Sequence, residues 1–363
     1  MDIFAATEGY ENWLRSLTPI DVDDFEYKHR RMADPHDPFP FFRATYYRWV
    51  QIWPKVCPDE TKAPRALGVG DLHLENFGSW RDVEGRLCWG VNDFDEAELL
   101  PYTNDLVRLA ASARVAEWGG HFTGKFSHIC RAIFTGYQDA LAQGGLPFVL
   151  EEEYPELRVL VMNSEHEPDK FWKKFRNKLA PPKLPPPPDV VDVLRRCLPG
   201  GVVAPEILSR PGAGLGSLGK LRFVAIARLA GSWVAREAKA LTPPATASAG
   251  NAPSPVRSQA EVLRSAIRSP DPFYLVDTKW ITRRLAPHCS RIEIGAIDTA
   301  VDVLRVFWAM GAETANVHLG STDDVDAIRH DFRDRSHHWL AECARVAAET
   351  SLRDWQTWQK NAA

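Results

Sequence analysis

The residues of this sequence best suited to chemistry are three polar side chains between Gly70 and Asp105. Asp71 and Asn76 stand five positions apart, and Asp93 follows a run of mostly hydrophobic residues. In phosphoryl transfer one aspartate orients the acceptor hydroxyl, while a second aspartate and an asparagine hold Mg²⁺ on the nucleotide phosphates. The pattern therefore predicts ATP and Mg²⁺ as cofactors, with Asp71 as the catalytic residue and Asn76 and Asp93 as metal ligands.

A β-hairpin is the element expected to bring these side chains together. Its arms would be residues 77–80 and 87–91, which contain aromatic and β-branched residues. Its turn, at residues 83–86, contains Gly85, which can adopt a positive φ. Because the open ends of a hairpin lie side by side, the polar residues that flank the two arms can converge on one point.

Two segments, GDLHLENFG at residues 70–78 and NDFDE at residues 92–96, are similar to motifs of known enzymes. Together they resemble the catalytic core of aminoglycoside and choline phosphotransferases. They are more similar still to those of a large bacterial family of unknown function that is itself thought to be kinase-like. The resemblance implies an α+β fold with the two lobes of a protein kinase. The alternative, unrelated acids in surface loops, fits two matching segments less well.

The resemblance also assigns roles to neighbouring residues. His73 would brace the catalytic loop, and Asp95 would either assist the metal or replace a glycine that is usual there. Asp105, twelve residues after Asp93, matches an aspartate that would cap a helix and hold the loop from behind. An arginine is usual in the preceding aromatic helix, so Arg43 would contact either a phosphate or an acidic partner in the catalytic loop.

A glycine-rich segment at residues 214–219 forms the second candidate site. It is followed by the hydrophobic residues 221–229, a short turn and a second predicted strand. A strand, a glycine loop and a strand in this order are typical of the kinase loop that covers nucleotide phosphates. Glycines let such a loop approach phosphate oxygens closely, although a glycine-rich hairpin without a ligand is the alternative. The residues expected to contact the nucleotide are Gly214, Gly216, Ser217, Gly219 and Lys220.

A kinase also needs a cation on the strand after the glycine loop. Arg236 lies seventeen residues after Gly219, close to the kinase-like spacing, whereas Lys239 has the usual chemistry. The two residues would lie on opposite faces of a regular strand. The spacing favours Arg236 slightly and leaves Lys239 open. Glu261, in a predicted short helix, is the expected acidic partner of this cation, with an exposed helix position as the alternative.

The order of these motifs is unusual, because in ordinary kinases the glycine loop and its cation precede the catalytic loop. Here the catalytic loop comes first, which predicts a circularly permuted version of the two-lobed fold. The expected organisation begins with a large helical lobe at residues 1–180 and a proline-rich linker at 181–207. A strand-rich small lobe follows at 208–290, and helices at 291–363 return to the large lobe. Expected helices include residues 40–53, 104–118, 121–142 and 292–315, with extended segments at 273–287 and a mobile loop at 242–255.

Composition excludes several classes of protein. The net charge of −4 argues against a nucleic-acid partner. No stretch of eighteen apolar residues indicates a membrane span, and the acidic N-terminus does not resemble a signal peptide. Six cysteines without a CxxC pair fit a reduced cytoplasmic protein.

Three functions compete at this stage. The leading one is phosphate transfer from ATP to a hydroxyl of a small molecule or protein, whose identity the sequence does not indicate. A second is transfer of AMP to a protein, and a third is a pseudokinase that binds nucleotide without catalysis. A metal-dependent hydrolase would become the better interpretation if the glycine loop lay far from Asp93.

Overall fold

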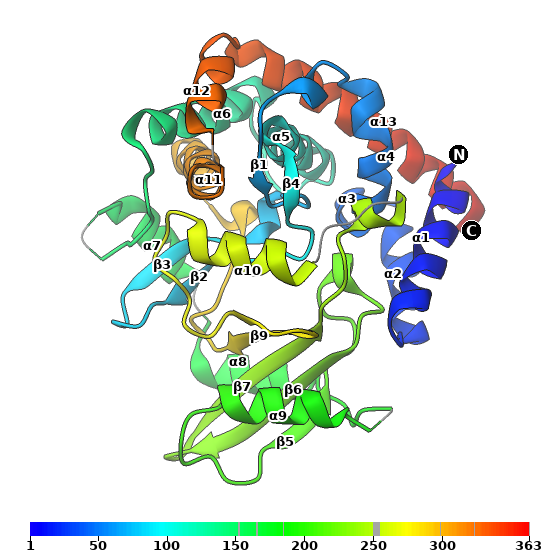
Figure 1. Ribbon diagram of the computed structural model, residues 1–363, viewed down its shortest axis with the longest axis vertical. Helices are drawn as coiled ribbons and strands as arrows, with labels where there is room; N and C mark the ends of the chain where they lie inside the picture. Colours follow the sequence, from blue (N-terminus) through cyan, green and yellow to red (C-terminus); the bar gives the residue numbers. More distant parts are fainter. Residues whose placement is uncertain are drawn as a thin grey trace.

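A computed structural model of the chain describes residues 1–151, 153–164, 166–183, 185–249, 255–297, 299–322 and 324–362. Figure 1 shows a larger part built mostly of helices and, below it in this view, a smaller part built around a sheet. The protein is therefore a mixed α and β structure, as predicted.

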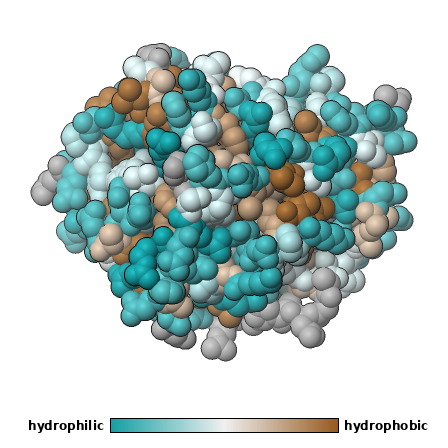
Figure 2. Space-filling model, turned by 90° about the horizontal axis from the view of Figure 1, so that it is seen from above, coloured by the Kyte–Doolittle hydropathy of each residue, from teal (hydrophilic) through white to brown (hydrophobic). Residues whose placement is uncertain are grey.

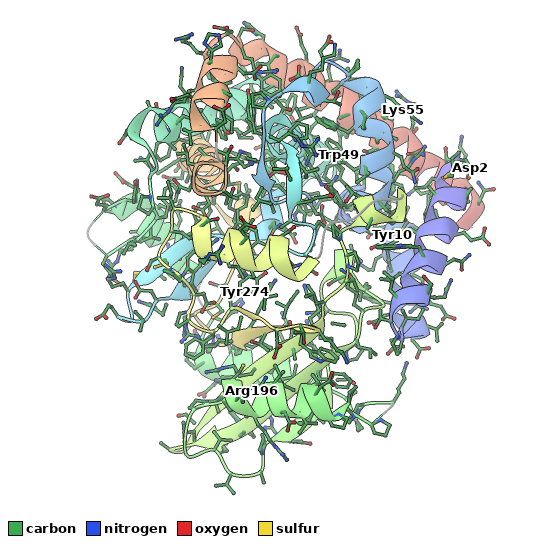
Figure 3. All side chains as sticks on the ribbon, viewed as in Figure 1. Asp2, Tyr10, Trp49, Lys55, Arg196 and Tyr274 are labelled. Atoms are coloured by element: carbon green, nitrogen blue, oxygen red, sulfur yellow. The ribbon has the colours of Figure 1, made fainter. Side chains whose placement is uncertain are left out.

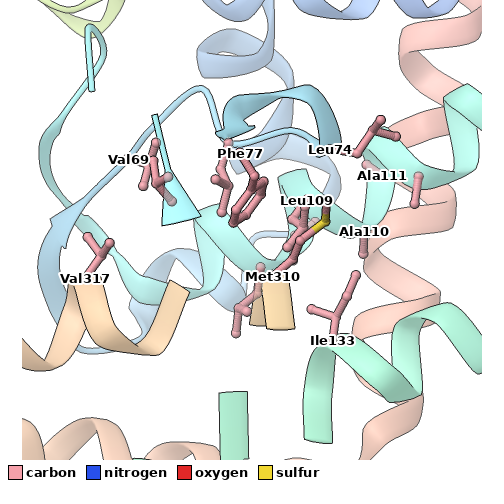
Figure 4. Packing of buried hydrophobic residues seen from close by; sticks show 14 of the residues in the cluster. Val69, Leu74, Phe77, Leu109, Ala110, Ala111, Ile133, Met310 and Val317 are labelled. Atoms are coloured by element: carbon pink, nitrogen blue, oxygen red, sulfur yellow. The ribbon is translucent and has the colours of Figure 1, made fainter. Parts of the chain in front are cut away.

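The centre of the larger part consists of four long helices: α5 (Tyr102–Trp118), α6 (Phe126–Gln143), α11 (Ala300–Gly320) and α13 (His337–Ala362). α6 and α11 pack so closely that a Cβ atom on Gly136 would lie 1.9 Å from the Trp308 carbonyl oxygen. Helices that precede the five-stranded sheet in sequence and helices that follow it thus share one hydrophobic core. Figure 4 shows this core around Leu109, Ile133 and Met310.

The N-terminal helices pack along one side of this core. They are α1 (Ile3–Leu17), α2 (Val22–Met32), α3 (Phe39–Ala44) and α4 (Tyr46–Val56). The single helix expected from Pro40 onward is broken at Thr45, where φ is −123° and ψ is 39°. The Thr45 hydroxyl donates a hydrogen bond to the Phe41 carbonyl at 2.8 Å, a side-chain bond of the kind that bends or interrupts helices.

Two small antiparallel sheets lie beside the central helices. One pairs β1 (Arg65–Gly68) with β4 (Glu98–Pro101), and the other pairs β2 (Phe77–Arg81) with β3 (Leu87–Val91). In the second sheet Phe77 lies opposite Val91. This pairing confirms the predicted hairpin, whose turn contains Gly85 with a φ of 78°.

The smaller part is built around a five-stranded antiparallel sheet with the strand order β5-β6-β7-β9-β8. The expected strand at residues 221–229 and the extended segments within 273–287 are confirmed by this sheet. Its strands are β5 (Glu206–Ser209), β6 (Arg222–Leu229), β7 (Ser232–Ala240), β8 (Leu275–Val276) and β9 (Trp280–Leu285).

Two helices that precede the sheet in sequence cover its faces. α8 (Pro168–Arg176) places Phe175 against Val224 and Ile226, while α9 (Pro188–Cys197) packs against the opposite face. The sequence assigned the first segment to the large lobe and the second to a linker. Both helices instead belong to the smaller part, because their apolar residues complete the two faces of the sheet.

The remaining elements connect these parts. The helix expected from residue 292 begins only at Ala300, where the Thr299 side chain accepts a hydrogen bond from the Asp302 backbone at the N-terminus. Part of the expected loop 242–255 forms a short 3₁₀ helix, and residues 250–254 lie outside the described chain. The remaining helices are α7 (Pro155–Asn163), α10 (Pro255–Ser265) and α12 (Val325–Arg333). The short 3₁₀ helices are η1 (Glu60–Lys62), η2 (Leu74–Asn76), η3 (Leu215–Ser217), η4 (Ala245–Ala249) and η5 (Ile294–Ala296).

The surface seen from above is mostly hydrophilic, with separate hydrophobic patches (Figure 2). Within the described residues, every helix is too short or too polar to cross a membrane. The six cysteines are all free thiols.

Candidate functional site

A narrow cleft lies between the larger part and the glycine-rich loop. It collects side chains and backbone from four segments that are far apart in sequence. Its lining residues are Arg43, Val69, Asp71, His73, Glu75, Asn76, Asp93, Asp95, Glu96, Gly214, Gly216 and Ser217. Eight residues of the predicted site therefore lie around one cleft, including members of both glycine-loop and catalytic-loop motifs.

The loop that carries Asp71 is held from behind by α5. The buried Asp105 carboxylate accepts hydrogen bonds from the backbone N–H groups of Val69 at 2.6 Å and Gly70 at 3.0 Å. His318 Nε2 lies 3.1 Å from the same carboxylate. Behind the loop, Val69 packs into the hydrophobic core (Figure 4). The fixed core thereby sets the position of Asp71.

Arg108, one helical turn after Asp105, binds the Asp71 side chain. Its Nε lies 2.9 Å from Asp71 Oδ1, and a second guanidinium nitrogen donates to the same oxygen. The Arg108 side chain is 1% exposed and lies over the rings of Phe42 and Tyr46. Burial raises the pKa of Asp71, whereas the charge and hydrogen bonds of Arg108 lower it. The sequence analysis missed Arg108, although its spacing of one helical turn from Asp105 was a usable signal.

Asn76 joins the two predicted metal-binding segments. Its amide nitrogen donates to the backbone carbonyl oxygens of Asp71 at 3.1 Å and Asp93 at 3.0 Å. Its Oδ1 atom is buried and has no hydrogen-bond partner in the described structure. The hairpin therefore brings Asp71, Asn76 and Asp93 together as its geometry predicted, and it leaves one amide oxygen open to a ligand.

Asp93 and Asp95 face two cations from the sheet. Lys239 Nζ lies 2.5 Å from Asp95 Oδ2 and 3.5 Å from Asp93 Oδ2. Arg283 donates to Asp93 Oδ1 at 3.0 Å. Although burial raises the pKa of Asp93, Arg283 and Lys239 hold it well below its usual range. Asp93 is therefore ionised at neutral pH, as a metal ligand must be.

The donor set fits a magnesium ion bound jointly by protein and substrate. Mg²⁺ usually takes one or two protein carboxylates and completes its octahedron with water and substrate phosphates. The buried Asn76 Oδ1 atom, which lacks a hydrogen-bond partner in the described structure, and the half-exposed Asp93 carboxylate match such a partial set. No group of three or more His, Cys, Asp or Glu side chains in the described ranges is arranged to hold a metal. Asp95 pairs with Lys239 in this structure.

The glycine loop closes over Asp71. A Cβ atom placed on Gly216 would lie 3.3 Å from Asp71 Oδ2 and 3.1 Å from the Arg43 carbonyl oxygen. Gly214 and Ser217 line the same cleft. Gly219, with a φ of +95°, packs instead against Phe25 of α2, because a Cβ there would lie 2.3 Å from the Phe25 ring.

Lys220, at the end of the glycine loop, approaches two acids of the cleft wall. Its Nζ lies 3.7 Å from Asp95 Oδ2 and 4.0 Å from Glu96 Oε1, and the side chain is 2% exposed. Glu96, which the sequence analysis missed, also accepts the Ala245 backbone N–H at 2.5 Å. Burial raises the pKa of Glu96 to about 7 although Lys220 opposes the shift. The acidic wall of the cleft thus extends to Glu96, the last residue of NDFDE, to which the sequence analysis gave no role.

Arg236, which the spacing favoured slightly, lies away from the acids of the cleft, whereas Lys239 contacts them. Arg236 points to the other face of the sheet, where its Nε donates to the Cys197 carbonyl oxygen at 2.8 Å and its guanidinium lies over Phe273. Alternation along β7 separates the two side chains, so only Lys239 faces the cleft. Glu261 lies on α10, and Lys239 pairs with Asp93 and Asp95 instead of this predicted partner.

His73 and Arg43 support the loop. The His73 Nδ1 atom accepts the Glu75 backbone N–H at 3.2 Å, and burial together with Arg43 and Arg108 holds the pKa of His73 well below its usual value. Arg43 and Arg291 both bind the Glu75 carboxylate. Arg43 therefore has the acidic partner in the catalytic loop that was one of its two predicted roles.

The cleft holds about 80 Å³. Small-molecule sites usually hold about 300–1,000 Å³, so this closed form has room for a phosphate group and not for a whole nucleotide. A larger cavity of about 650 Å³ lies between α6, α7 and α11, but none of the predicted site residues lines it. The Asp71 cleft and this larger cavity are therefore separate.

Part of the chain is similar to a known protein family. Residues 21–180 match a family described as an uncharacterized protein conserved in bacteria (DUF2252). No curated protein and no solved structure matches the chain. The matched range includes the catalytic loop, the hairpin and Arg108, and it ends before β5. Over this range the chain is similar to an uncharacterised bacterial family, in agreement with that part of the sequence resemblance.

Proposed function

We propose that this protein is a Mg²⁺- and ATP-dependent phosphotransferase that acts on a hydroxyl group. One observation carries the proposal: Asp71, Asn76 and Asp93 line one cleft with Gly214 and Gly216, and Lys239 of the sheet pairs with Asp93. More than a hundred residues separate the first three groups from the glycine loop and Lys239 in sequence. Phosphoryl transfer needs this combination of an acceptor-side aspartate, a metal-side pair and a phosphate-binding cation.

Each residue has a distinct task in this proposal. Arg108 binds Asp71 Oδ1 and leaves Oδ2, which faces the glycine loop, to orient the acceptor hydroxyl. Asn76 Oδ1 and Asp93 would hold Mg²⁺, which neutralises phosphate charge when bound. Lys239 would bind phosphate oxygens, and the backbone of Gly214 and Gly216 would cover them.

The arrangement of elements supports a kinase-like, circularly permuted fold as part of the same proposal. The smaller part runs through a strand, the glycine loop, a strand, the Lys239 strand, a helix and two further strands. This is the order expected for the small lobe of a kinase, here placed after the catalytic loop. The helices that follow the sheet return to the core of the larger part.

Nucleotide entry requires the glycine loop to lift away from Asp71, because the closed cleft is too small. Binding energy from the nucleotide would then favour an open or partly closed form, as in enzymes whose loops close over substrate. A thermal-shift series therefore provides a first check. ATP with Mg²⁺ at about 100 times its Kd should stabilise the fold by about 2.7 kcal/mol, and ATP without the metal should stabilise it less.

Labelled ATP tests the reaction itself. The protein is incubated with γ-labelled or α-labelled ATP, a bacterial metabolite extract and Mg²⁺, alongside the Asp71→Asn variant. Transfer of the γ label by the wild type, and not by Asp71→Asn, supports the proposal. Transfer of the α label would establish the AMP transferase, and metal-dependent binding without transfer of either label would indicate a pseudokinase.

A further inference from the structure

Four cations lie on the face of the sheet that looks toward the cleft. Arg210 directly follows β5, and Arg222, Lys239 and Arg283 lie on β6, β7 and β9. Arg222 stands opposite Lys239, and Arg283 stands opposite Glu237, two positions from Lys239. Because alternate residues of a strand share a face, these side chains project to the same side. We call this set the cation row.

The cation row carries more positive charge than its carboxylate partners neutralise. Arg222 and Arg210 donate to the two oxygens of buried Glu237 at 2.6 and 2.9 Å, while Lys239 and Arg283 reach Asp93 and Asp95. Four cations therefore face three carboxylates. Burial alone would raise the pKa of Glu237, yet the surrounding arginines lower it to about 2.

Two groups in the row have unused hydrogen-bonding capacity. The Nε–H groups of Arg210 and Arg283 are buried and have no acceptor in the described structure. Buried polar groups without partners are uncommon, and a water, an ion or a catalytic role can account for them. Arg222 also donates to Ser217 Oγ at 2.8 Å and lies beside Gly214, so the row continues beneath the glycine loop.

We propose that the cation row binds the phosphate chain of the nucleotide, with Arg222 and Arg283 as phosphate contacts beside Lys239. The inference rests on the proposed function and extends it to residues that no motif indicated. Arginine suits this task because its planar guanidinium can bind two phosphate oxygens at once. A ligand that engages Asp93 through a metal would release Arg283 and Lys239 from that carboxylate for contact with phosphate.

A row of this kind responds to the number of phosphates in the ligand. AMP would reach only part of the row, while ATP and inorganic tripolyphosphate would span several cations. Affinity should therefore rise from AMP to ADP to ATP, and the gain should shrink as salt is added. Tripolyphosphate isolates this effect because it has no base or sugar.

Titration calorimetry of the full chain tests the inference. AMP, Mg²⁺–ATP and tripolyphosphate are titrated into the wild type, Arg222→Gln, Arg283→Gln and the control Arg228→Gln. Arg228 lies on the same strand as Arg222, but its guanidinium donates to the Gly231 carbonyl and covers Trp233 at the far end. Loss of a charged hydrogen-bond partner should weaken ATP and tripolyphosphate binding about 10–100-fold in the two row variants, and AMP binding by a smaller factor.

The outcomes separate this inference from the proposed function. Unchanged ATP and tripolyphosphate binding in both row variants overturns the inference, while ATP turnover in those variants leaves the proposed function standing. Tripolyphosphate binding that depends on Arg222, without binding or turnover of ATP, supports the row and overturns the kinase. Absence of binding by any phosphate compound to the wild type overturns both.

Arg222→Gln leaves the Glu237 carboxylate with fewer partners and could prevent folding. The double variant Arg222→Gln/Glu237→Gln removes that buried charge as well. The double variant is titrated beside Glu237→Gln alone, so that the comparison still isolates Arg222.

Discussion

The two walls of the cleft are held in different ways. The wall that carries Asp71 is fixed from inside, since buried Asp105 binds its backbone and Arg108 binds its carboxylate. The glycine loop is held from outside by the start of α2. Asp24 accepts the Gly212 backbone N–H at 3.0 Å, and the Asp21 backbone N–H donates to the Gly219 carbonyl at 3.1 Å.

This difference indicates which wall moves. Moving the Asp71 wall would expose a buried carboxylate and disturb the hydrophobic core behind it, which is costly. Moving residues 212–217 would break the hydrogen bond between Gly212 and Asp24 near the surface, while Lys220 at the end of the loop keeps its buried ion pairs with Asp95 and Glu96. We therefore expect a preformed catalytic wall and a loop that opens and closes over it.

The largest expected effect separates the two tasks within the fixed wall. Asp71→Asn should lower the rate of phosphate transfer about 100–10,000-fold while ATP binding stays nearly unchanged, because an acceptor-side group does not hold the nucleotide. Asp93→Asn should weaken the Mg²⁺-dependent part of ATP binding. Paired binding and transfer assays check this, and equal losses of binding and turnover in both variants would contradict the assignment.

Removal of Asp105, the support behind the fixed wall, should have the next largest effect, a loss of folding stability. Asp105→Ala leaves two backbone N–H groups and His318 without their carboxylate partner, and losses of this kind cost about 3–5 kcal/mol. Urea unfolding would measure the loss against Asp326→Ala, whose side chain is 93% exposed. A similar free energy of unfolding in the two variants would show that the loop does not depend on Asp105.

Acid should destabilise the sheet side through Glu237. Its pKa is lowered to about 2 in the folded protein, so its ionised form stabilises the fold at neutral pH, and this contribution disappears as the pH falls toward 2. The contribution is at most about 3 kcal/mol. Unfolding free energies of wild type and Glu237→Gln should differ at pH 7 and converge on acidification. A difference that stays constant with pH would refute this explanation.

The smallest effect concerns the outer hold on the glycine loop. Asp24→Ala removes the acceptor of the Gly212 N–H group and should speed ATP association several-fold, because one hydrogen bond contributes about 1 kcal/mol. The matched control is Asp23→Ala, whose side chain is 72% exposed and pairs with Lys183. Stopped-flow binding measures both rates. Equal rates in Asp24→Ala, Asp23→Ala and wild type would mean that α2 does not restrain the loop.

The local sequence pattern predicted those elements of the site whose structure depends on residues close together in sequence. The hairpin between Asn76 and Asp93 follows from alternating residues and a turn glycine, and Asp105 lies at a helix start as expected. The strand after the glycine loop was also predictable, because residues 221–229 are β-branched and apolar.

The errors arose where distant packing decides the outcome. Spacing from Gly219 favoured Arg236, but the direction of a strand residue depends on which face meets the larger part, and that face carries Lys239. Arg222 and Arg283 look like ordinary strand residues in the sequence. Their contacts with Ser217, Glu237 and Asp93 exist only because three strands align.

Tyr274 has a mechanical consequence for any motion of the sheet. Its hydroxyl accepts one hydrogen bond from Arg283 of β9 at 2.9 Å and another from the Phe94 backbone at 3.3 Å, so it ties the sheet to the larger part. Tyr274 is labelled in Figure 3. β9 lies toward one edge of the sheet, and β5 and β6, which flank the glycine loop, lie toward the other. Any motion of the sheet that accompanies opening of the glycine loop should therefore be small at β9 and larger toward β5. Spectroscopic labels should show a wide displacement at the β5 edge and almost none at β9.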